Sequence, residues 1–462
     1  MALPSPQYRS PGPDVPDSGD RTLSAPVGLR PLQAVADQPP APQPAGGSRL
    51  RAPLAAAATM AAAVVVYMFL KWLLIQDAER SPLLAIYGTV VTAYLVSRTL
   101  AGHRYRLSSL DTAVLPSVAF IVPVKNEGLM IGVTIRGLFE AQYPDDRFEV
   151  VVVNDGSDDE TATVLRIAKR AHPHLKVIDL PKNVGKRHAM AAGIRATTSD
   201  VVVVIDSDTL VEPNAVSLLV RSFADPSVAA VSGLTNILNE DVSVLTRVQA
   251  LIYEISFKIH KSAEALFGSV TCCPGCFSAY RRECIAPLLD EWSTQTFLGR
   301  ETIFGDDRAL TMLLLREGWN VRFDADAVAH TEAPERFRGY LRQQLRWKKS
   351  WIQQGLRACR FMWRRPLLSA LWFYTGFALS FVGPHVLLRA FIIGPVFHHS
   401  FPWRLLLGTW AIGAGFAAYL SLRRGDTKRL KAIWAYPLVA ILLTLQMPFA
   451  IARLADSKWG TR

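Results

Sequence analysis

The chain has 462 residues, half of them hydrophobic, and carries a formal net charge of +12 at pH 7. This charge and a mean hydropathy of +0.19 are typical of a membrane protein with basic cytosolic loops. We expect no nucleic-acid partner, because the Lys and Arg residues cluster beside apolar segments rather than on one soluble face. Five cysteines, an odd number, exclude a secreted disulfide framework and indicate reduced thiols.

The N-terminal part of the chain divides into a polar tail and two apolar segments. Residues 1–51 are rich in Pro, Ala, Ser and Gly without periodicity, which predicts a disordered tail. Two transmembrane helices are predicted within residues 52–106, at Leu54–Ile75 and at the more marginal Pro82–Leu100. Arginines flank the pair on both outer sides, so the chain beyond residue 106 is expected in the cytosol. A buried helical hairpin is the alternative.

Residues 107–333 are predicted to form a soluble α/β domain. Apolar runs typical of strands alternate with helical stretches, which indicates a mainly parallel sheet with helices on both faces. Ligands of such sheets bind at the carboxyl ends of the strands. The predicted strands are Val118–Val124, Glu149–Val153, Lys176–Leu180, Val201–Ile205 and Val228–Val231, and the helices between them include Met130–Ala141, Glu160–Ala171 and Lys186–Thr197.

Polar residues follow these strands at the predicted ligand edge. The first strand leads into Pro123, Asn126 and Glu127, and the second ends at Asp155, where a carboxylate could accept hydrogen bonds from a nucleobase or ribose. A plain strand–turn–helix connection would look the same. Lys186 opens a later helix, where backbone N–H groups and cations suit a phosphate; a solvated helix start is the alternative.

The run Val201–Asp208 ends a buried strand on two carboxylates. Alternation along an extended chain would point Asp206 and Asp208 the same way, with Ser207 opposite. Two such acids make a hard oxygen site for Mg²⁺ or Mn²⁺, of the kind that holds a diphosphate. A strand that ends in a polar turn would show the same residues.

Four motifs occur in order along the chain: Asp155-Gly-Ser, Asp206-Ser-Asp, Gly305-Asp-Asp-Arg308 and Gln343-Gln-Leu-Arg-Trp347. This set resembles the family 2 glycosyltransferases, which are inverting GT-A enzymes that use nucleotide-diphosphate sugars. Within them it is most similar to the processive membrane synthases of hyaluronan, chitin and nodulation chitin oligosaccharides. The resemblance implies a UDP-sugar donor, a growing polysaccharide acceptor and secretion of the product through the enzyme's own helices.

The resemblance also implies roles for residues of these motifs. Asp307 would be the base that deprotonates the acceptor hydroxyl, although a helix N-cap would explain the same acid. Arg346 would bind the diphosphate. Trp347 would lie under the acceptor sugar, with a buried core tryptophan as the alternative. The other residues that the resemblance places at the acceptor are Gln343, Asp306 and Arg308.

The product is less well defined by the sequence. Gln295–Gly299 is similar to bacterial hyaluronan synthases, and Trp459, Thr461 and Arg462 resemble their gating loop, whereas Pro274–Arg281 resembles chitin synthases. We therefore expect hyaluronan, made from UDP-GlcNAc and UDP-GlcA, with chitin or a chitin oligosaccharide as the alternative. A non-processive transferase acting on a lipid carrier usually lacks the Gln-x-x-Arg-Trp stretch, and the intact acids speak against an inactive scaffold.

The remaining features concern the thiols and the membrane. Cys273 and Cys276 could form a redox pair, or a zinc site together with Cys272 and Cys284. No second Cys-x-x-Cys follows, and the resemblance implies a loop beside the acceptor instead. Residues 334–365 are predicted as amphipathic interface helices, and residues 366–456 as transmembrane helices in a multi-pass plasma-membrane protein. The basic linker 423–431 should be cytosolic. A gating role for residues 457–462 then requires either that the last apolar segment enters and leaves the membrane on one side, which we favour, or that the topology differs elsewhere. The three C-terminal apolar segments are Leu367–Val396, Trp403–Leu422 and Ala432–Ala452.

Overall fold

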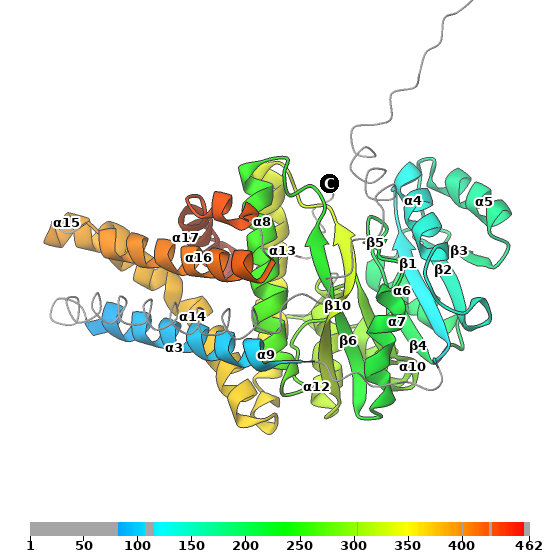
Figure 1. Cartoon of the computed structure of the whole chain (residues 1–462), viewed down its shortest axis with the longest axis horizontal. Helices are drawn as coiled ribbons and strands as arrows, with labels where there is room; N and C mark the ends of the chain where they lie inside the picture. Colours follow the sequence, from blue (N-terminus) through cyan, green and yellow to red (C-terminus); the bar gives the residue numbers. More distant parts are fainter. Residues whose placement is uncertain (1–81, 107–114, 303, 400, 425–426, 457–462) are drawn as a thin grey trace, which may run out of the picture. The chain divides into compact units, whose positions relative to one another are not determined.

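The computed structural model describes residues 82–106, 115–302, 304–399, 401–424 and 427–456. The predicted tail, the segment Leu54–Ile75 and the ending Trp459–Arg462 lie outside these residues. Within them, an α/β unit is joined to a group of long apolar helices (Figure 1).

An eight-stranded sheet forms the centre of the α/β unit, in the order β3-β2-β1-β4-β7-β6-β10-β5. The first four strands in this order are parallel, as are β6 and β10, whereas β7 is antiparallel to both of its neighbours and β5 to β10. The predicted mainly parallel sheet is thereby confirmed. The strands are β1 (Val118–Val124), β2 (Phe148–Asn154), β3 (Leu175–Asp179), β4 (Val201–Val204), β5 (Leu210–Val211), β6 (Val228–Ile237), β7 (Ser278–Arg281) and β10 (Asn320–Thr331), with a separate hairpin of β8 (Thr296–Phe297) and β9 (Arg300–Glu301).

Alternation along β1 divides the buried residues into two layers. Ala119 and Ile121 pack with α6 and α12, while Phe120 and Val122 pack with α4, α5 and α7 on the other face. The helices of the unit are α4 (Gly128–Phe139), α5 (Thr161–Ala171), α6 (Lys186–Arg195), α7 (Ala215–Val220), α8 (Val244–Glu254), α9 (Ser262–Ala265), α10 (Arg282–Ile285), α11 (Leu289–Ser293), α12 (Asp306–Arg316) and α13 (Phe337–Ala358).

The sequence predicts that the two acids after β4 continue an extended strand, but in the structure the strand ends before them. β4 stops at Val204, so Asp206 and Asp208 lie in a turn in which the N–H of Thr209 donates to the Asp206 carbonyl (3.1 Å). The predicted extended strand is therefore wrong for these residues, because a turn and not a pleated strand orients their carboxylates.

Gly193 shows how closely α6 packs on the sheet. A Cβ at this position would lie 2.8 Å from Cγ2 of Ile121 and 3.0 Å from Cγ2 of Val153. We expect Gly193→Ala to lower the free energy of unfolding by about 1–3 kcal/mol, because the added methyl overpacks the core. Gly137→Ala in α4 is the matched control, since no atom lies within 4 Å of its Cβ position. Thermal unfolding in detergent compares them, and an unchanged midpoint for Gly193→Ala would contradict this packing.

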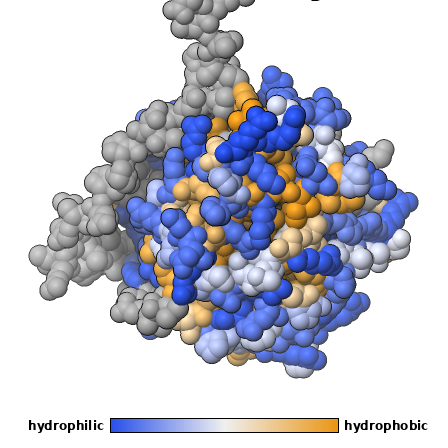
Figure 2. Space-filling view, turned by 90° about the vertical axis from the view of Figure 1, so that its right-hand side faces the viewer, coloured by the Kyte–Doolittle hydropathy of each residue, from blue (hydrophilic) through white to orange (hydrophobic). Residues whose placement is uncertain are grey.

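Among the described residues, three helices are long and apolar enough to cross a membrane: Pro82–Arg104, Leu367–His398 and Leu405–Arg423. The second continues without a break through Pro384. These helices expose large apolar side chains such as Ile86, Leu371 and Trp410. The surface seen from the side of α4 and α5 is instead mainly hydrophilic, with a narrower apolar band (Figure 2). The three candidate membrane spans are made up of α3 (Pro82–Arg104), α14 (Leu367–Leu388), a π-helical turn (Arg389–Ile393), α15 (Gly394–His398) and α16 (Trp403–Arg424).

The last apolar segment is shorter than these three and forms two helices, α17 (Tyr436–Leu445) and α18 (Met447–Ala452). After them the chain returns to α13, where Lys349 Nζ donates to the Asp456 carbonyl (2.6 Å) and Gln353 Nε2 to the Leu454 carbonyl (3.1 Å). These bonds hold the end of the described chain on a helix of the α/β unit. The two bonds agree with a last apolar segment that enters and leaves the membrane on one side, and this topology stays a prediction.

Candidate active site

Lys186, the first residue of α6, joins acids from two distant parts of the chain. Its Nζ lies 2.5 Å from Oδ1 of Asp206, in the turn after β4, and 3.6 Å from Oδ2 of Asp306, the first residue of α12. Gly275 lies beside all three, because a Cβ there would be 3.1 Å from Lys186 Nζ and 3.5 Å from Asp206 Oδ1. The structure therefore brings together three residues that the sequence analysis proposed for the site.

The charges of this cluster are strongly coupled. Burial raises the pKa of Asp206, the charges of Asp208 and Asp306 act in the same direction, and Lys186 opposes them. Burial disfavours the cation of Lys186, but Asp206, Asp306 and Asp307 outweigh it and hold the pKa of this lysine above its usual value. Several carboxylates thus share one lysine, which makes the group a favourable place for further positive charge.

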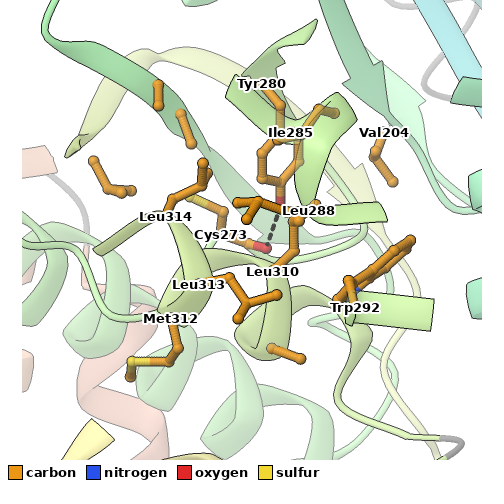
Figure 3. Packing of buried hydrophobic residues seen from close by; sticks show 14 of the residues in the cluster. Val204, Cys273, Tyr280, Ile285, Leu288, Trp292, Leu310, Met312, Leu313 and Leu314 are labelled. Atoms are coloured by element: carbon orange, nitrogen blue, oxygen red, sulfur yellow. Dashed lines mark hydrogen bonds between the residues drawn. The ribbon is translucent and has the colours of Figure 1, made fainter. Parts of the chain in front are cut away.

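The start of α12 is built from a glycine and a buried tryptophan. Gly305 precedes the helix with a φ of +70°, and a Cβ there would lie 2.0 Å from Oγ of Ser350 in α13. Only glycine combines this left-handed conformation with such a close approach. Trp292, which belongs to the same buried cluster as Leu310 of α12 (both labelled in Figure 3), donates from Nε1 to the Asp306 carbonyl (2.9 Å). The N-cap of α12 is thus Gly305, and the two acids follow inside the helix.

Asp307 points one oxygen at the backbone and the other at a thiol. Its Oδ1 accepts the N–H of Arg308 (2.7 Å), and its Oδ2 lies 3.5 Å from Sγ of Cys272. Burial raises the pKa of Asp307 and Asp306 adds to the shift, whereas the charge of Arg308 opposes it. The raised pKa makes this carboxylate a stronger base than an ordinary aspartate.

Helix α13 carries the Gln-x-x-Arg-Trp residues. The Trp347 side chain is 43% exposed, and its ring lies 6.1 Å from that of Tyr253 in α8, so it is not a buried core tryptophan. Oε1 of Gln343 is shielded from solvent and accepts no hydrogen bond from the described residues. Arg346 is half-buried and has a partner within the chain. The guanidinium of Arg308 lies 4.9 Å from the ring of Trp351, also in α13.

The residues proposed to bind the nucleotide hold two loops together. Asp155 is buried, and its carboxylate accepts the N–H groups of Val184 (2.7 Å) and Gly185 (3.0 Å), which lead into α6. Asn126, with a φ of +53°, donates to a carboxylate oxygen of Asp158 in the next loop (2.5 Å). The Glu127 N–H donates to Oγ1 of Thr161 (3.1 Å), and Pro123 pairs with Val153 in the sheet. Asp155 therefore positions the start of α6, and binding of a nucleobase or ribose stays a prediction.

Three residues of this site were not identified as site residues from the sequence: Cys272, Gly275 and Tyr253. No motif marks Tyr253, which lies near the end of α8, just before a π-helical segment (Ile255–Lys261). Its placement depends on how α8 packs, and burial together with Cys276, Asp208 and Asp206 raises its pKa. Gly275 lies in the Pro274–Arg281 stretch, and the resemblance of that stretch to chitin synthases was the available signal. The five cysteines are free thiols, and no cluster of three metal-binding side chains occurs among the described residues.

Comparison with known proteins places the chain in a family. The family model described as Glycosyltransferase like family 2 matches residues 116–350, about half of the chain. The chain belongs to glycosyltransferase family 2 and is a glycosyltransferase. An N-acetylglucosaminyltransferase of Rhizobium meliloti (strain 1021) is 30% identical over 400 residues, which cover 84% of this chain and 92% of the relative. An N-acetylglucosaminyltransferase of Rhizobium leguminosarum bv. viciae is 32% identical over 397 residues, covering 82% and 90%.

A solved structure is similar over most of the chain. It is a mannosyltransferase from Pyrobaculum calidifontis in complex with GDP-Man and Mn²⁺, with 25% sequence identity and a TM-score of 0.54. The likeness covers 78% of this chain and 99% of that chain. The fold is thus GT-A with added apolar helices, as predicted.

Proposed function

We propose that this chain is a processive, inverting membrane glycosyltransferase that joins GlcNAc units from UDP-GlcNAc into a β-linked chain. The observation that carries the proposal is the cluster of Lys186, Asp206 and Asp306 next to Asp307. The names of the relatives favour GlcNAc as the transferred sugar, and so favour the chitin-oligosaccharide alternative over hyaluronan. Hyaluronan remains the second candidate because Gln295–Gly299 resembles its synthases.

The donor would bind beside the paired Lys186 and Asp206, at the turn after β4. Mg²⁺ and Mn²⁺ are commonly held by one or two carboxylates together with substrate phosphates and water, and Asp208 and Asp206 offer that donor set. We assign Asp208 as the main ligand and Asp206, which also binds Lys186, as the second. A divalent cation there would offset the charge that develops on the leaving diphosphate. The mannosyltransferase complex with GDP-Man and Mn²⁺ supports a metal-assisted donor site.

The transfer itself needs a base on the opposite side of the sugar. An acceptor hydroxyl oxygen would attack the anomeric carbon of GlcNAc, the bond to the diphosphate oxygen would break, and the hydroxyl proton would move to the Asp307 carboxylate. In-line attack converts the α-linked donor into a β-linked product. Arg346 would contact the diphosphate. Asp306 and Arg308 flank the base and shift its pKa in opposite directions: Asp306 raises it and Arg308 lowers it.

Trp347 is proposed as the floor of the acceptor site, because its indole is exposed beside Tyr253. Trp347→Ala is expected to weaken the use of a GlcNAc-oligosaccharide acceptor by about tenfold, and Trp347→Phe by less, since a smaller ring retains part of the contact. KM for the oligosaccharide measures this effect. Trp363→Ala is the control, because Trp363 is also exposed but stacks on Arg364. Equal effects of Trp347→Ala and Trp363→Ala would contradict the acceptor role.

The pH dependence of transfer should report the surroundings of Asp307. A base acts when deprotonated, so activity falls as pH falls through its pKa, which burial and Asp306 raise. Asp306→Asn is expected to move the acid limb of the kcat profile to lower pH. Arg308→Gln should move it to higher pH, because the lost cation lowered this pKa. Rates of UDP release at saturating UDP-GlcNAc measure both shifts, and displacement of the two limbs in the same direction would contradict this assignment.

The product is tested with the purified chain in detergent or lipid discs, supplied with Mg²⁺ or Mn²⁺. UDP-GlcNAc alone is expected to give UDP and a GlcNAc oligomer or polymer. A product that forms only when UDP-GlcA is also present would favour hyaluronan, and absence of UDP release with either donor would overturn the function.

Secretion through the helices α3, α14 and α16 from a cytosolic site in the plasma membrane is part of the proposal, which their exposed apolar surfaces support. Reconstitution in vesicles tests it: products made from outside should appear in the lumen.

A further inference from the structure

Arg98 is a charged residue inside α3, one of the candidate membrane spans. Its side chain is 4% exposed, and its Nη2 lies 2.5 Å from Oε1 of Glu264 in α9. Nη2 also donates to the His260 carbonyl (3.1 Å), and Nη1 donates to the Tyr94 hydroxyl (2.7 Å). An ionised group in such a helix is costly unless its partners are fixed, so this ion pair holds α3 at a defined place on the catalytic unit.

The second oxygen of Glu264 binds a loop of the active site. Oε2 accepts both the N–H of Thr271 (2.9 Å) and its hydroxyl (3.1 Å). Thr271 directly precedes Cys272, whose Sγ lies 3.5 Å from Oδ2 of Asp307. One carboxylate thus lies between an arginine of a membrane helix and the loop that contacts the proposed base.

The loop comprises residues 271–276, and its part after Cys272 is held by residues of α12 and β7. The Cys273 N–H donates to Oγ1 of Thr311 in α12 (2.9 Å), and its carbonyl accepts the Tyr280 hydroxyl (3.2 Å, Figure 3). Oγ1 of Thr311 in turn donates to the Asp307 carbonyl (2.7 Å). The loop therefore spans from the Glu264 carboxylate to the start of α12, and a displacement of Glu264 changes the geometry at Cys272 first.

We infer that Arg98 and Glu264 are positioning residues for the transfer step, and that they couple the docking of α3 to the geometry around Asp307. The inference rests on the proposed function, in which Asp307 takes the acceptor proton. Neither residue touches the substrate: Arg98 orients Glu264, and Glu264 holds Thr271 so that Cys272 stays against Asp307. Misplacement of groups by about 1 Å can cost about a hundredfold in rate, so a loosened loop would be visible in kcat.

Glu264→Gln tests this inference in the full chain, because the amide keeps the size of the side chain but loses the charge that binds Arg98. Asp324→Asn is the matched control: this buried carboxylate is also bound by one arginine, Arg221 (2.8 and 2.9 Å), but it lies in β10. Two quantities are measured: kcat and KM for UDP-GlcNAc, and the rate at which a maleimide labels Cys272, resolved by mass spectrometry. Thr271→Val is the second variant, in case Glu264→Gln does not fold.

Glu264→Gln is expected to lower kcat by at least about tenfold with little change in the donor KM, and to speed the labelling of Cys272. Asp324→Asn should leave both within about twofold, even if it lowers the thermal midpoint similarly. Thr271→Val should act in the same direction as Glu264→Gln. Unchanged kcat and unchanged labelling in Glu264→Gln or Thr271→Val would overturn the inference. So would an equal loss in Asp324→Asn, which would mean that the ion pair only stabilises the fold. Failure of the unmodified chain to release UDP would instead overturn the proposed function, while Cys272 labelling still reports the loop.

Discussion

Asp307→Asn is expected to remove transfer of GlcNAc while UDP still binds. The amide has the shape of the carboxylate and can still accept the N–H of Arg308, but it cannot take up the acceptor proton. General base catalysis contributes about a hundredfold to ten-thousandfold, so the loss in kcat should fall in this range. UDP release from UDP-GlcNAc measures the rate, and isothermal titration with UDP measures binding.

Asp290→Asn is the control for this change, because Asp290 is an exposed acid whose carboxylate pairs with Arg195 (2.6 Å) away from the cluster. Its activity should match that of the unmodified chain. An Asp307→Asn protein that retains more than about a tenth of the original kcat would remove Asp307 from the base role. A protein that loses UDP binding as well would show that the substitution disturbs the donor site.

Removal of divalent cations is expected to stop transfer, and Asp208→Asn to raise the metal concentration needed for half-maximal rate by about tenfold or more. The physical reason is the loss of one of two carboxylates offered to the cation, since metal sites commonly lose affinity by such factors when a supporting group is removed. Activity is measured after treatment with EDTA and during titration with Mn²⁺ or Mg²⁺. Restoration by added cation separates metal loss from unfolding.

Glu212→Gln is the control for Asp208→Asn, because Glu212 follows the same turn and pairs with His330 (3.1 Å). Its metal requirement should be unchanged. Full activity of the unmodified chain in EDTA would contradict metal assistance. An Asp208→Asn protein with an unaltered metal requirement would instead point to other ligands.

Features set by neighbouring residues could be predicted from the sequence. The apolar run Val118–Val124 is β1 with the same bounds, and the alternation of strands and helices predicted the sheet. Lys186 and Asp206 were recognised because a helix start and a strand end fall at one edge of a parallel sheet. The motifs supplied Asp307 and Trp347, since their roles depend on resemblance and not on periodicity.

Features set by tertiary packing could not be predicted in this way. The end of β4 at Val204 depends on its partners in the sheet, so the orientation of Asp208 was derived from a strand that had already stopped. The carboxylate of Asp155 is occupied by Val184 and Gly185 because the loop before α6 folds back over it. Glu264 and Arg98 are in contact although they lie in distant parts of the sequence, so no local pattern could predict this ion pair.

The antiparallel strand β7 has a consequence for how this enzyme can diversify. Ser278, at the beginning of β7, pairs with Val204, at the end of β4, so the chain arrives at the ligand edge just before β7 starts. That incoming stretch holds Gly275, beside Lys186 and Asp206, and Cys272, beside Asp307, so insertions or exchanges in it would act on both sides of the proposed site. Variation in this one approach to the sheet would therefore change the contacts of donor and acceptor together, while the connections after β1, β2 and β4 stay in register.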